Sequence, residues 1–385
     1  IILIFTGCSS DIKKKTIKNE KKHDNKQILK KIKKQENKIL TKNFNSNILI
    51  KLNNIPDKKL FTELYNNYGR QEIRDISDNF LKTKIKKIKN FSNFEPNIVF
   101  NKKGLIFFEN KGNLIKFDFA NKLIWKKNYY SKQEQKSNPQ INFALNKKNL
   151  IVSDTLAKYY RINPETGDIL WSKTNSSQFN SQIKIFKDRF YAVDSENTLH
   201  CFSTKDGNKI WSYKTENFFI KSKKKLSIVI ENDKVIFNNS VGDITAVDAN
   251  KGTLLWQTPT QNNQIYGETI SLRTSNIVLD NDSIYFSNNK NEFYSLNKND
   301  GFINWKQTIN SDVSPIITNK ILFTVSNEGF LFFIDTQNGN ILKSQDLFGS
   351  YNDKTRNILN PIGMSLGIDK IFITLNNGKL IVVEI

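Results

Sequence analysis

Gly167-Asp168-Ile169-Leu170-Trp171 is the stretch that decides the fold, because versions of it return along the whole chain. Successive copies of its last position lie 46, 40, 45, 49 and 38 residues apart, and a Gly stands four residues before five of the six copies. All five tryptophans of the protein occupy this position: Trp125, Trp171, Trp211, Trp256 and Trp305. The glycines are Gly167, Gly207, Gly252, Gly301 and Gly339; Asn121 stands in the first copy, and Lys343 replaces Trp in the sixth.

Three further strands precede each copy of this segment. The strand directly before it begins at a turn and alternates apolar and polar residues, as in 242–248. Another strand precedes that one, as in 189–193 and 321–325. The first strand of a unit is often opened by proline, which is tolerated where no ladder donor is needed. Those prolines are Pro96, Pro139, Pro315 and Pro361. Each unit therefore predicts four antiparallel strands joined by tight turns.

Such a unit cannot cover both faces of its own sheet, whereas sheets packed radially against one another bury both. We therefore predict an all-β fold, a β-propeller with the Trp strand outermost in each blade and the indole between adjacent blades. The Gly would supply the positive φ of the hairpin that delivers the Trp.

The repeats are clear from residue 92, and they give seven blades, the last without its fourth strand. We expect residues 84–88, which alternate suitably, to supply that strand and close the ring. Within 44–82 the sequence favours a strand at 47–52 and a helix at 56–67, and the alternative is that this region forms an eighth blade. The predicted domains are residues 1–8, 9–43 and 44–385, the last being the propeller.

Composition limits the chemistry of this 385-residue chain. It has 59 Lys and Arg against 37 Asp and Glu, a formal net charge of +22, with 28 Phe and 12 Tyr to fill a core. Two Cys and two His are too few for a zinc, iron–sulfur or c-type haem site. No apolar run reaches the roughly 18–20 residues that a membrane-spanning helix needs.

The first residues resemble the end of a bacterial lipoprotein signal peptide, in which an apolar stretch meets a small residue and then Cys. Here Ile1–Phe5 is followed by Thr6, Gly7 and Cys8, and we expect the sequence to begin inside the signal because no charged start precedes it. The resemblance implies lipid attachment (palmitate among the acyl groups) at Cys8 and, with Ser9 next to it, the periplasmic face of the outer membrane. The alternatives are a plain signal remnant or a short buried strand.

A basic segment follows, with 13 Lys between residues 13 and 42 against three acidic residues. Such a charge density cannot bury enough surface to fold alone, so 9–43 is predicted to be a disordered tether. It is either a solvated linker, the reading we favour, or a tether that also attracts anionic lipid headgroups. The lipid signal argues against a nucleic-acid partner.

The repeated Gly-x-x-x-Trp hairpin is similar to the quinoprotein-type (PQQ-like) propeller repeat. With the lipoprotein signal and the Trp missing at Lys343, the chain resembles the BamB-type lipoproteins of outer-membrane protein assembly. That resemblance implies a scaffold without catalysis or cofactor. Its partners would be the periplasmic domains of the barrel-inserting subunit BamA and unfolded outer-membrane proteins. The BamB-type ring has eight blades, so the seven found here are a departure.

The resemblance also implies a partner-binding loop after the third blade, with an apolar-x-apolar-basic pattern. The matching residues here are Phe218, Phe219, Ile220 and Lys221, followed by further lysines. The alternative is that the two Phe open the next inner strand. The paired acids of the family's next loop are replaced here by Ser271, Leu272 and Arg273, so that contact is not reproduced.

The rival class is a quinoprotein dehydrogenase, which shares the repeat. Such enzymes resemble one another in a vicinal Cys pair, a calcium ion and a catalytic Asp, whereas Cys8 and Cys201 are far apart here, as are His23 and His200. We expect Cys201 to be buried in a strand and His200 to be a surface residue. Acids recur before the outer hairpin, which predicts turn capping rather than catalysis: Asp118, Asp248 and Asp335. A sugar- or peptidoglycan-binding propeller is a third alternative.

Overall fold

The computed structural model describes residues 39–48, 50, 52, 67–70, 98–101, 103–109, 112–146, 148–215, 225–260, 274–288, 291–367 and 369–385. Residues 40–385 form one compact unit. The predicted closing strand 84–88 lies outside the described residues, as does nearly all of the predicted helix 56–67. Among the helices that the structure describes, none is long and apolar enough to cross a bilayer.

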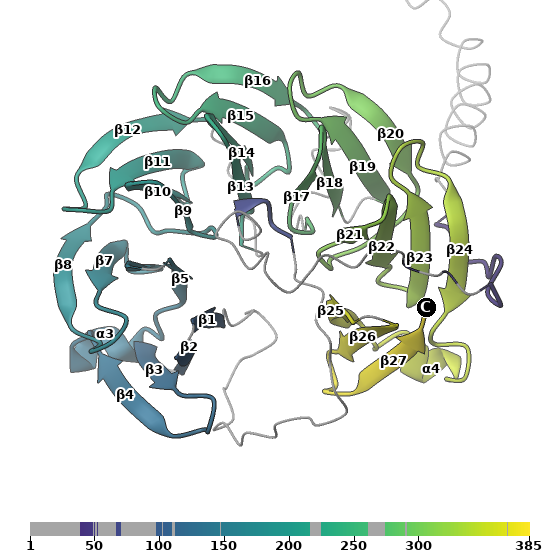
Figure 1. The fold of residues 1–385 in the computed structure, drawn as a ribbon, viewed down its shortest axis with the longest axis horizontal. Helices are drawn as coiled ribbons and strands as arrows, with labels where there is room; N and C mark the ends of the chain where they lie inside the picture. Colours follow the sequence, from purple (N-terminus) through teal and green to yellow (C-terminus); the bar gives the residue numbers. More distant parts are fainter. Residues whose placement is uncertain are drawn as a thin grey trace, which may run out of the picture. The chain divides into compact units, whose positions relative to one another are not determined.

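Seven antiparallel sheets make up the described part of this unit, six of four strands and one of three, as the repeat predicted (Figure 1). In each sheet the strands follow chain order, so every blade is a simple meander. Blades 1 to 3 comprise β1 (Val99–Asn101), β2 (Gly104–Glu109), β3 (Asn113–Phe117) and β4 (Leu123–Asn128); β5 (Ile141–Leu145), β6 (Leu150–Asp154), β7 (Lys158–Ile162) and β8 (Ile169–Thr174); and β9 (Lys184–Phe186), β10 (Arg189–Val193), β11 (Thr198–Ser203) and β12 (Lys209–Lys214).

The remaining blades repeat the pattern, and two short helices lie in the connections after β4 and β24, α3 (Lys132–Lys136) and α4 (Asp353–Arg356). Pro361 opens the first strand of blade 7, and Pro315 directly precedes that of blade 6. Blades 4 to 7 comprise β13 (Ile228–Glu231), β14 (Lys234–Asn238), β15 (Ile244–Asp248) and β16 (Leu254–Thr258); β17 (Val278–Asp280), β18 (Ser283–Asn288), β19 (Glu292–Asn297) and β20 (Ile303–Gln307); β21 (Ile316–Thr318), β22 (Ile321–Val325), β23 (Phe330–Asp335) and β24 (Ile341–Asp346); and β25 (Pro361–Leu366), β26 (Lys370–Leu375) and β27 (Leu380–Glu384).

Strand alternation explains why each blade needs two neighbours. Successive side chains of a strand point to opposite faces of its sheet. In β14, Val235 and Phe237 pack against blade 3, whereas Ile236 between them packs against blade 5. Six apolar clusters of this kind fill the six interfaces between consecutive blades from 1 to 7.

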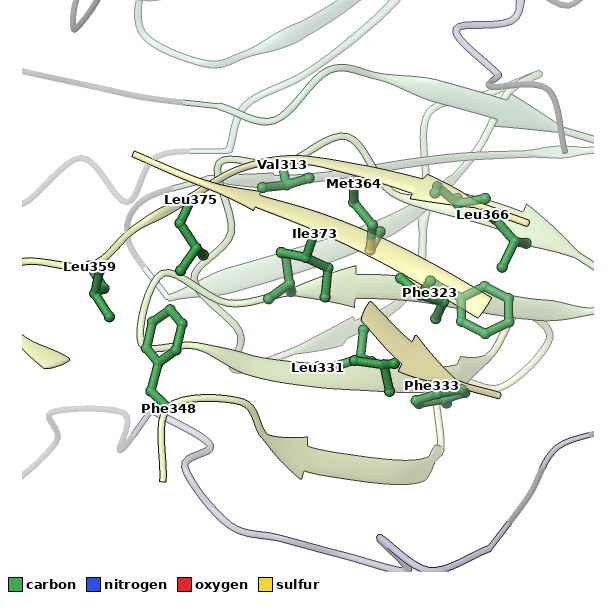
Figure 2. Close-up of a cluster of buried hydrophobic side chains, with 14 residues drawn as sticks. Val313, Phe323, Leu331, Phe333, Phe348, Leu359, Met364, Leu366, Ile373 and Leu375 are labelled. Carbon is green, nitrogen blue, oxygen red and sulfur yellow. The ribbon is translucent and has the colours of Figure 1, made fainter. Parts of the chain in front are cut away.

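Figure 2 shows the cluster between blades 6 and 7, where Phe323 and Phe333 of blade 6 meet Met364 and Ile373 of blade 7. All four side chains are almost completely buried. Blade 7, which has three described strands, is therefore held by the same apolar packing as the others. Burial of this kind contributes roughly 25 cal/mol per Å² of apolar surface.

A β-bulge recurs beside the Trp position in every four-stranded blade. Lys116 pairs with Trp125 and the next residue, Phe117, pairs with Leu123, so Ile124 is an extra residue on the outer strand. The same shift occurs in blades 2 to 6. Because a bulge interrupts the alternation, two consecutive residues before the Trp position can both face outward.

Candidate functional site

The rim of the propeller is built from one junction repeated five times. Each Trp lies on the outer strand of one blade and packs against the Gly of the following blade's outer hairpin. The contact is close: at one junction, a Cβ placed on Gly252 would lie only 2.5 Å from Trp211 Cε3. That hairpin bends at φ +72° at Gly252, which an L side chain rarely adopts. In the structure the indole thus lies between adjacent blades.

Each indole N–H also donates a hydrogen bond to the next blade. The acceptor is always the backbone carbonyl three residues before the hairpin Gly, at 3.0 to 3.2 Å. The pairs are Trp125 with Pro164, Trp171 with Thr204, Trp211 with Ala249, Trp256 with Lys298, and Trp305 with Thr336. The indole therefore satisfies a turn carbonyl while covering the Gly, a fit that needs both its flat ring and its donor.

The sixth junction is different. Lys343 takes the Trp position, is buried, and donates from Nζ to the carbonyl of Ile48 at 2.8 Å. Its Nζ also lies 5.0 Å from the centroid of the Phe333 ring, its cross-strand partner. Among the described residues, a segment from early in the chain lies against the outer strand of this blade, at the place where the other five junctions have a blade hairpin.

That segment, residues 40–48, is called the clasp below. Phe44 forms an antiparallel bridge to Ser344 of β24, with backbone bonds of 3.0 and 2.8 Å in the two directions. The predicted strand at 47–52 is wrong for its described residues, because pairing with β24 occurs at Phe44. Alternation of apolar and polar residues does not indicate that the edge of blade 6 pairs with a residue further upstream.

Exposed apolar residues mark the outer strands beside the junctions, as the bulges require. Leu123 and Ile124 of blade 1 are 49% and 43% exposed, and Leu254 and Leu255 of blade 4 are 48% and 47% exposed. Other blades contribute Ile169, Leu170, Ile210, Phe302, Ile303 and Leu342. Apolar side chains repeated at blade spacing on the outer strands give a surface suited to protein partners.

A second early segment, residues 67–70, touches the innermost strands of three blades. Asn67 Nδ2 donates to the carbonyl of Ile185 in blade 3, and the Leu279 N–H of blade 5 donates to the carbonyl of Tyr68. Arg70 forms an ion pair of 2.8 Å with Asp280 of blade 5 and donates to the carbonyl of Ile317 in blade 6. Asn67, Tyr68 and Arg70 therefore link blade 3 to blades 5 and 6, which are not its neighbours.

Polar side chains are buried at an equivalent inner position of blades 2 and 3. In blade 3, His200 Nε2 lies 2.8 Å from Asp194 Oδ2, and both side chains are almost fully buried. The prediction that His200 is a surface residue was wrong, because its ring stacks on Phe202 and pairs with Asp194, whose place in the turn the sequence did not reveal. In blade 2, Tyr160 takes the place of His200, and Tyr130 donates to Asp154 at 2.5 Å.

The pKa values of the two buried aspartates, Asp154 and Asp194, shift in opposite directions. Burial raises the pKa of Asp154, and the bonds from Tyr130 and two backbone N–H groups offset this only in part. Burial also acts to raise the pKa of Asp194, but the bond from His200 and those from Thr198 and Glu196 N–H bring the pKa below its ordinary value. Both carboxylates are thus engaged in turns and interfaces.

The other residues weighed for catalysis also have structural places. Cys201 is a buried free thiol in β11, as predicted, and burial raises its pKa to about 11, which disfavours the reactive thiolate. Asp118, Asp248 and Asp335 accept turn N–H groups at 2.8 Å, so their capping role is confirmed. Within the described residues there is no group of three or more His, Cys, Asp or Glu that could hold a metal ion.

Several predicted site residues lie outside the described part. These are the lipid-attachment residue Cys8 and the partner loop Phe218–Phe219–Ile220–Lys221. Their roles stay predictions.

Comparison with known proteins identifies the family to which the repeat belongs. A PQQ_2 family model, described as outer membrane protein assembly factor BamB, matches residues 97–345, well over half of the chain. The chain belongs to the BamB family. The matched residues run from the start of blade 1 nearly to the end of β24, so the family repeat and the rim junctions coincide.

Solved structures are similar to this BamB-family chain at low identity. BamB from Moraxella catarrhalis has a TM-score of 0.49 at 12% identity, over 75% of this chain and 96% of that chain. The C-terminal WD40 domain of Sif2 has a TM-score of 0.56 at 13% identity, over 75% and 82%. Quinohemoprotein alcohol dehydrogenase from Comamonas testosteroni has 0.47 at 13%, over 60% and 50%. The likeness to Sif2 supports a propeller fold alone, and no curated protein matches the chain in sequence.

Membership of the BamB family supports a scaffold rather than an enzyme and suggests association with outer-membrane assembly.

Proposed function

We propose that this protein is a non-catalytic scaffold of the outer-membrane β-barrel assembly complex. In this proposal it binds the periplasmic domains of the barrel-inserting subunit BamA and assists the insertion of unfolded outer-membrane proteins. The observation that carries the proposal is the BamB family match, which covers nearly all the rim junctions. The geometry supports it, because the acids weighed for catalysis cap turns and the buried His200 and Cys201 lie within blades, while apolar side chains are exposed along the rim.

The proposal includes the domain organisation expected from the sequence. Cys8 would carry the lipid that holds the protein at the periplasmic face of the outer membrane, and residues 9–43 would link it to the propeller. Replacing the Cys in Cys8→Ala should move the protein from the membrane pellet to the soluble periplasmic fraction, measured by fractionation of cells. Retention of this variant in the pellet would contradict lipid attachment.

The partner is tested by affinity capture from detergent-solubilised envelopes. Tagged protein should recover the barrel-inserting subunit at roughly equal stoichiometry, identified by mass spectrometry. A double variant and a matched control then test the predicted loop. The double variant Phe219→Ala with Lys221→Glu should lower recovery of the barrel-inserting subunit about tenfold or more, because it removes an apolar anchor and a charge contact. The control Lys306→Ala, an exposed lysine of β20, should leave recovery unchanged. Absence of the subunit from the captured material would defeat the proposal.

The alternative is a quinoprotein dehydrogenase-like protein, because such enzymes share the repeat. It is tested directly with purified protein, pyrroloquinoline quinone and calcium, monitored by the absorbance of bound quinone and by alcohol oxidation. We expect neither binding nor turnover. Stoichiometric quinone binding would favour the enzyme. Binding of sugars or peptidoglycan fragments, measured by calorimetry, would favour a ligand-binding propeller instead.

A further inference from the structure

The outer edge of blade 6 is already used as a strand-binding site within this chain. The clasp lies along β24, and both backbone groups of Ser344 bond to Phe44. Asn43 Oδ1 accepts from the Asp346 N–H at 2.7 Å, and Asn45 Nδ2 donates to the Leu342 carbonyl at 3.2 Å. The outward-facing groups of Leu342, Ser344 and Asp346 alternate along β24, as the free edge of an antiparallel ladder requires.

Recognition at this edge is directed at the backbone. The Ser344 hydroxyl donates to the carbonyl of Lys42, and the Lys343 ammonium donates to the carbonyl of Ile48. Neither bond depends on the side chain of the residue that accepts it. An edge that grips carbonyls with a Lys and a Ser would hold any extended segment of suitable length.

The clasp fits this edge incompletely. Full backbone pairing occurs at Phe44 alone, while the flanking positions are bonded by the side chains of Asn43 and Asn45. The Phe44 and Ile48 side chains are 51% and 52% exposed, so they bury little apolar surface against the propeller. Leu40 is the clasp residue that packs, partly buried, against the cluster between blades 5 and 6. A continuous strand could form more ladder bonds here than the clasp does.

We propose that the outer edge of β24 is a strand-acceptor site, covered by the clasp until an extended segment of an unfolded outer-membrane protein replaces it. This inference rests on the proposed function and names the place where that client is held. A continuous client strand gains backbone bonds at Leu342 and Asp346 over the clasp. The clasp of a second copy would bring the same two asparagines and gain none, so exchange between copies is not favoured.

The test uses the full-length protein and a fluorescent synthetic peptide of eleven residues in which Val and Thr alternate around a central Tyr. The variant Asn43→Ala with Asn45→Ala weakens the clasp and leaves β24 unchanged. Because two hydrogen bonds that compete with the peptide are removed, this variant should bind the peptide about tenfold tighter than the wild type, measured by fluorescence anisotropy.

Two controls test the edge itself. Ser344→Pro removes the N–H that an added strand needs, and proline is tolerated on an edge strand where the N–H faces outward. Placed in the weakened-clasp protein, this change should abolish peptide binding while the circular dichroism spectrum stays that of the parent. The same peptide with N-methyl groups on alternate amides should not bind the weakened-clasp protein.

Equal peptide binding by the wild type, the weakened-clasp protein and its Ser344→Pro derivative would overturn the proposal, as would no binding by any of them. Dimerisation of the weakened-clasp protein in light scattering, with no peptide binding, would assign the edge to a second copy and also overturn it. Recovery of the barrel-inserting subunit by Ser344→Pro protein separates the two proposals. The scaffold function stands if the subunit is recovered while the strand-acceptor site fails its own test.

Discussion

The five tryptophan junctions and the lysine junction of blade 6 occupy the same repeat position and make different contacts. Each indole covers a glycine hairpin of the next blade and donates to its carbonyl, whereas Lys343 reaches the carbonyl of Ile48 in the clasp. The side chain at this position therefore follows the element that lies against it. A flat ring suits a tight hairpin, and a long flexible donor suits a single extended segment.

Blade 1 adds a detail to the comparison. There Lys116, the cross-strand neighbour of Trp125, is fully buried and donates to the Pro164 carbonyl that also accepts the indole N–H. In blade 6 the aromatic residue and the lysine are exchanged between strands, with Phe333 on β23 and Lys343 on β24. A lysine beside an aromatic ring is thus compatible with either strand, and the position of the acceptor decides which one carries the donor.

Removing an indole should have the largest effect. Trp256→Ala should lower the free energy of unfolding by about 3–5 kcal/mol, because it leaves a cavity between blades 4 and 5 and removes the bond to Lys298. Urea denaturation followed by fluorescence or circular dichroism measures this. The matched variant Trp256→Phe keeps an aromatic ring and should cost clearly less. A loss below about 1 kcal/mol for the Ala variant would mean that the rim junctions do not hold the blades together.

The glycine side of the junction comes next. Gly252→Ala should cost about 2–3 kcal/mol, since the new methyl group meets Trp211 in addition to the unfavourable positive φ. Gly378 is a matched control, because its φ is +82° and nothing lies within 4 Å of an added Cβ. Gly378→Ala should cost only the backbone penalty of about 1 kcal/mol. Equal losses in the two variants would show that the contact with the indole contributes nothing.

The lysine junction should be weaker. Lys343→Met keeps the apolar stem but removes the donor to Ile48, and we expect a loss of about 1 kcal/mol together with faster trypsin cleavage in the clasp. Lys306→Met, which removes an exposed ion pair on the neighbouring outer strand, should change stability by less than about 0.5 kcal/mol. If the two variants behave alike, Lys343 does not fix the clasp.

The smallest expected effect is a difference in the pH dependence of stability between variants of blade 2 and blade 3, which share the Trp junction. The pKa of Asp154 is raised in the folded protein, so its stabilising contribution is present below about pH 4 and is lost as pH rises through the folded pKa. The pKa of Asp194 is lowered, so its contribution is present above about pH 4 and is lost as pH falls through the folded pKa. Relative to the wild type, Asp154→Asn should gain less stability on acidification from pH 7 to pH 4, and Asp194→Asn should lose less stability on further acidification from pH 4 to pH 2. Urea titrations at several pH values measure both, and shifts of the same sign would contradict this account.

The repeated segments were enough to predict the blades. Trp follows Gly by four residues in blade after blade because every junction uses the same hairpin, so seven sheets, the outer strands and the indoles between blades could be predicted from the sequence. The bulge before each Trp was not predicted, because a strand with one extra residue has no distinct composition. In blades 1, 2 and 4 its trace in the sequence is the pair of apolar residues, such as Leu254 and Leu255, directly before the Trp.

Contacts between distant segments were beyond such reasoning. Nothing in the residues around Phe44 or Tyr68 repeats, so no periodicity linked them to β24 or to the inner strands. The one signal was Lys343, whose departure from Trp was noticed without its cause. His200 was misplaced because its partner, Asp194, is six residues away and becomes adjacent only when the turn between β10 and β11 forms.

Residues 67–70 have a mechanical consequence. Nearest-neighbour packing lets a propeller lose a blade contact without affecting a blade two places away, but Asn67, Tyr68 and Arg70 hold strands of blades 3, 5 and 6 at once. Strain that separates blade 3 from blade 6 must therefore also break these short polar links. Unfolding that starts in blade 3 under force or heat is therefore coupled to blades 5 and 6, and deleting the chain up to Arg70 would remove that coupling, so that the blades unfold one at a time.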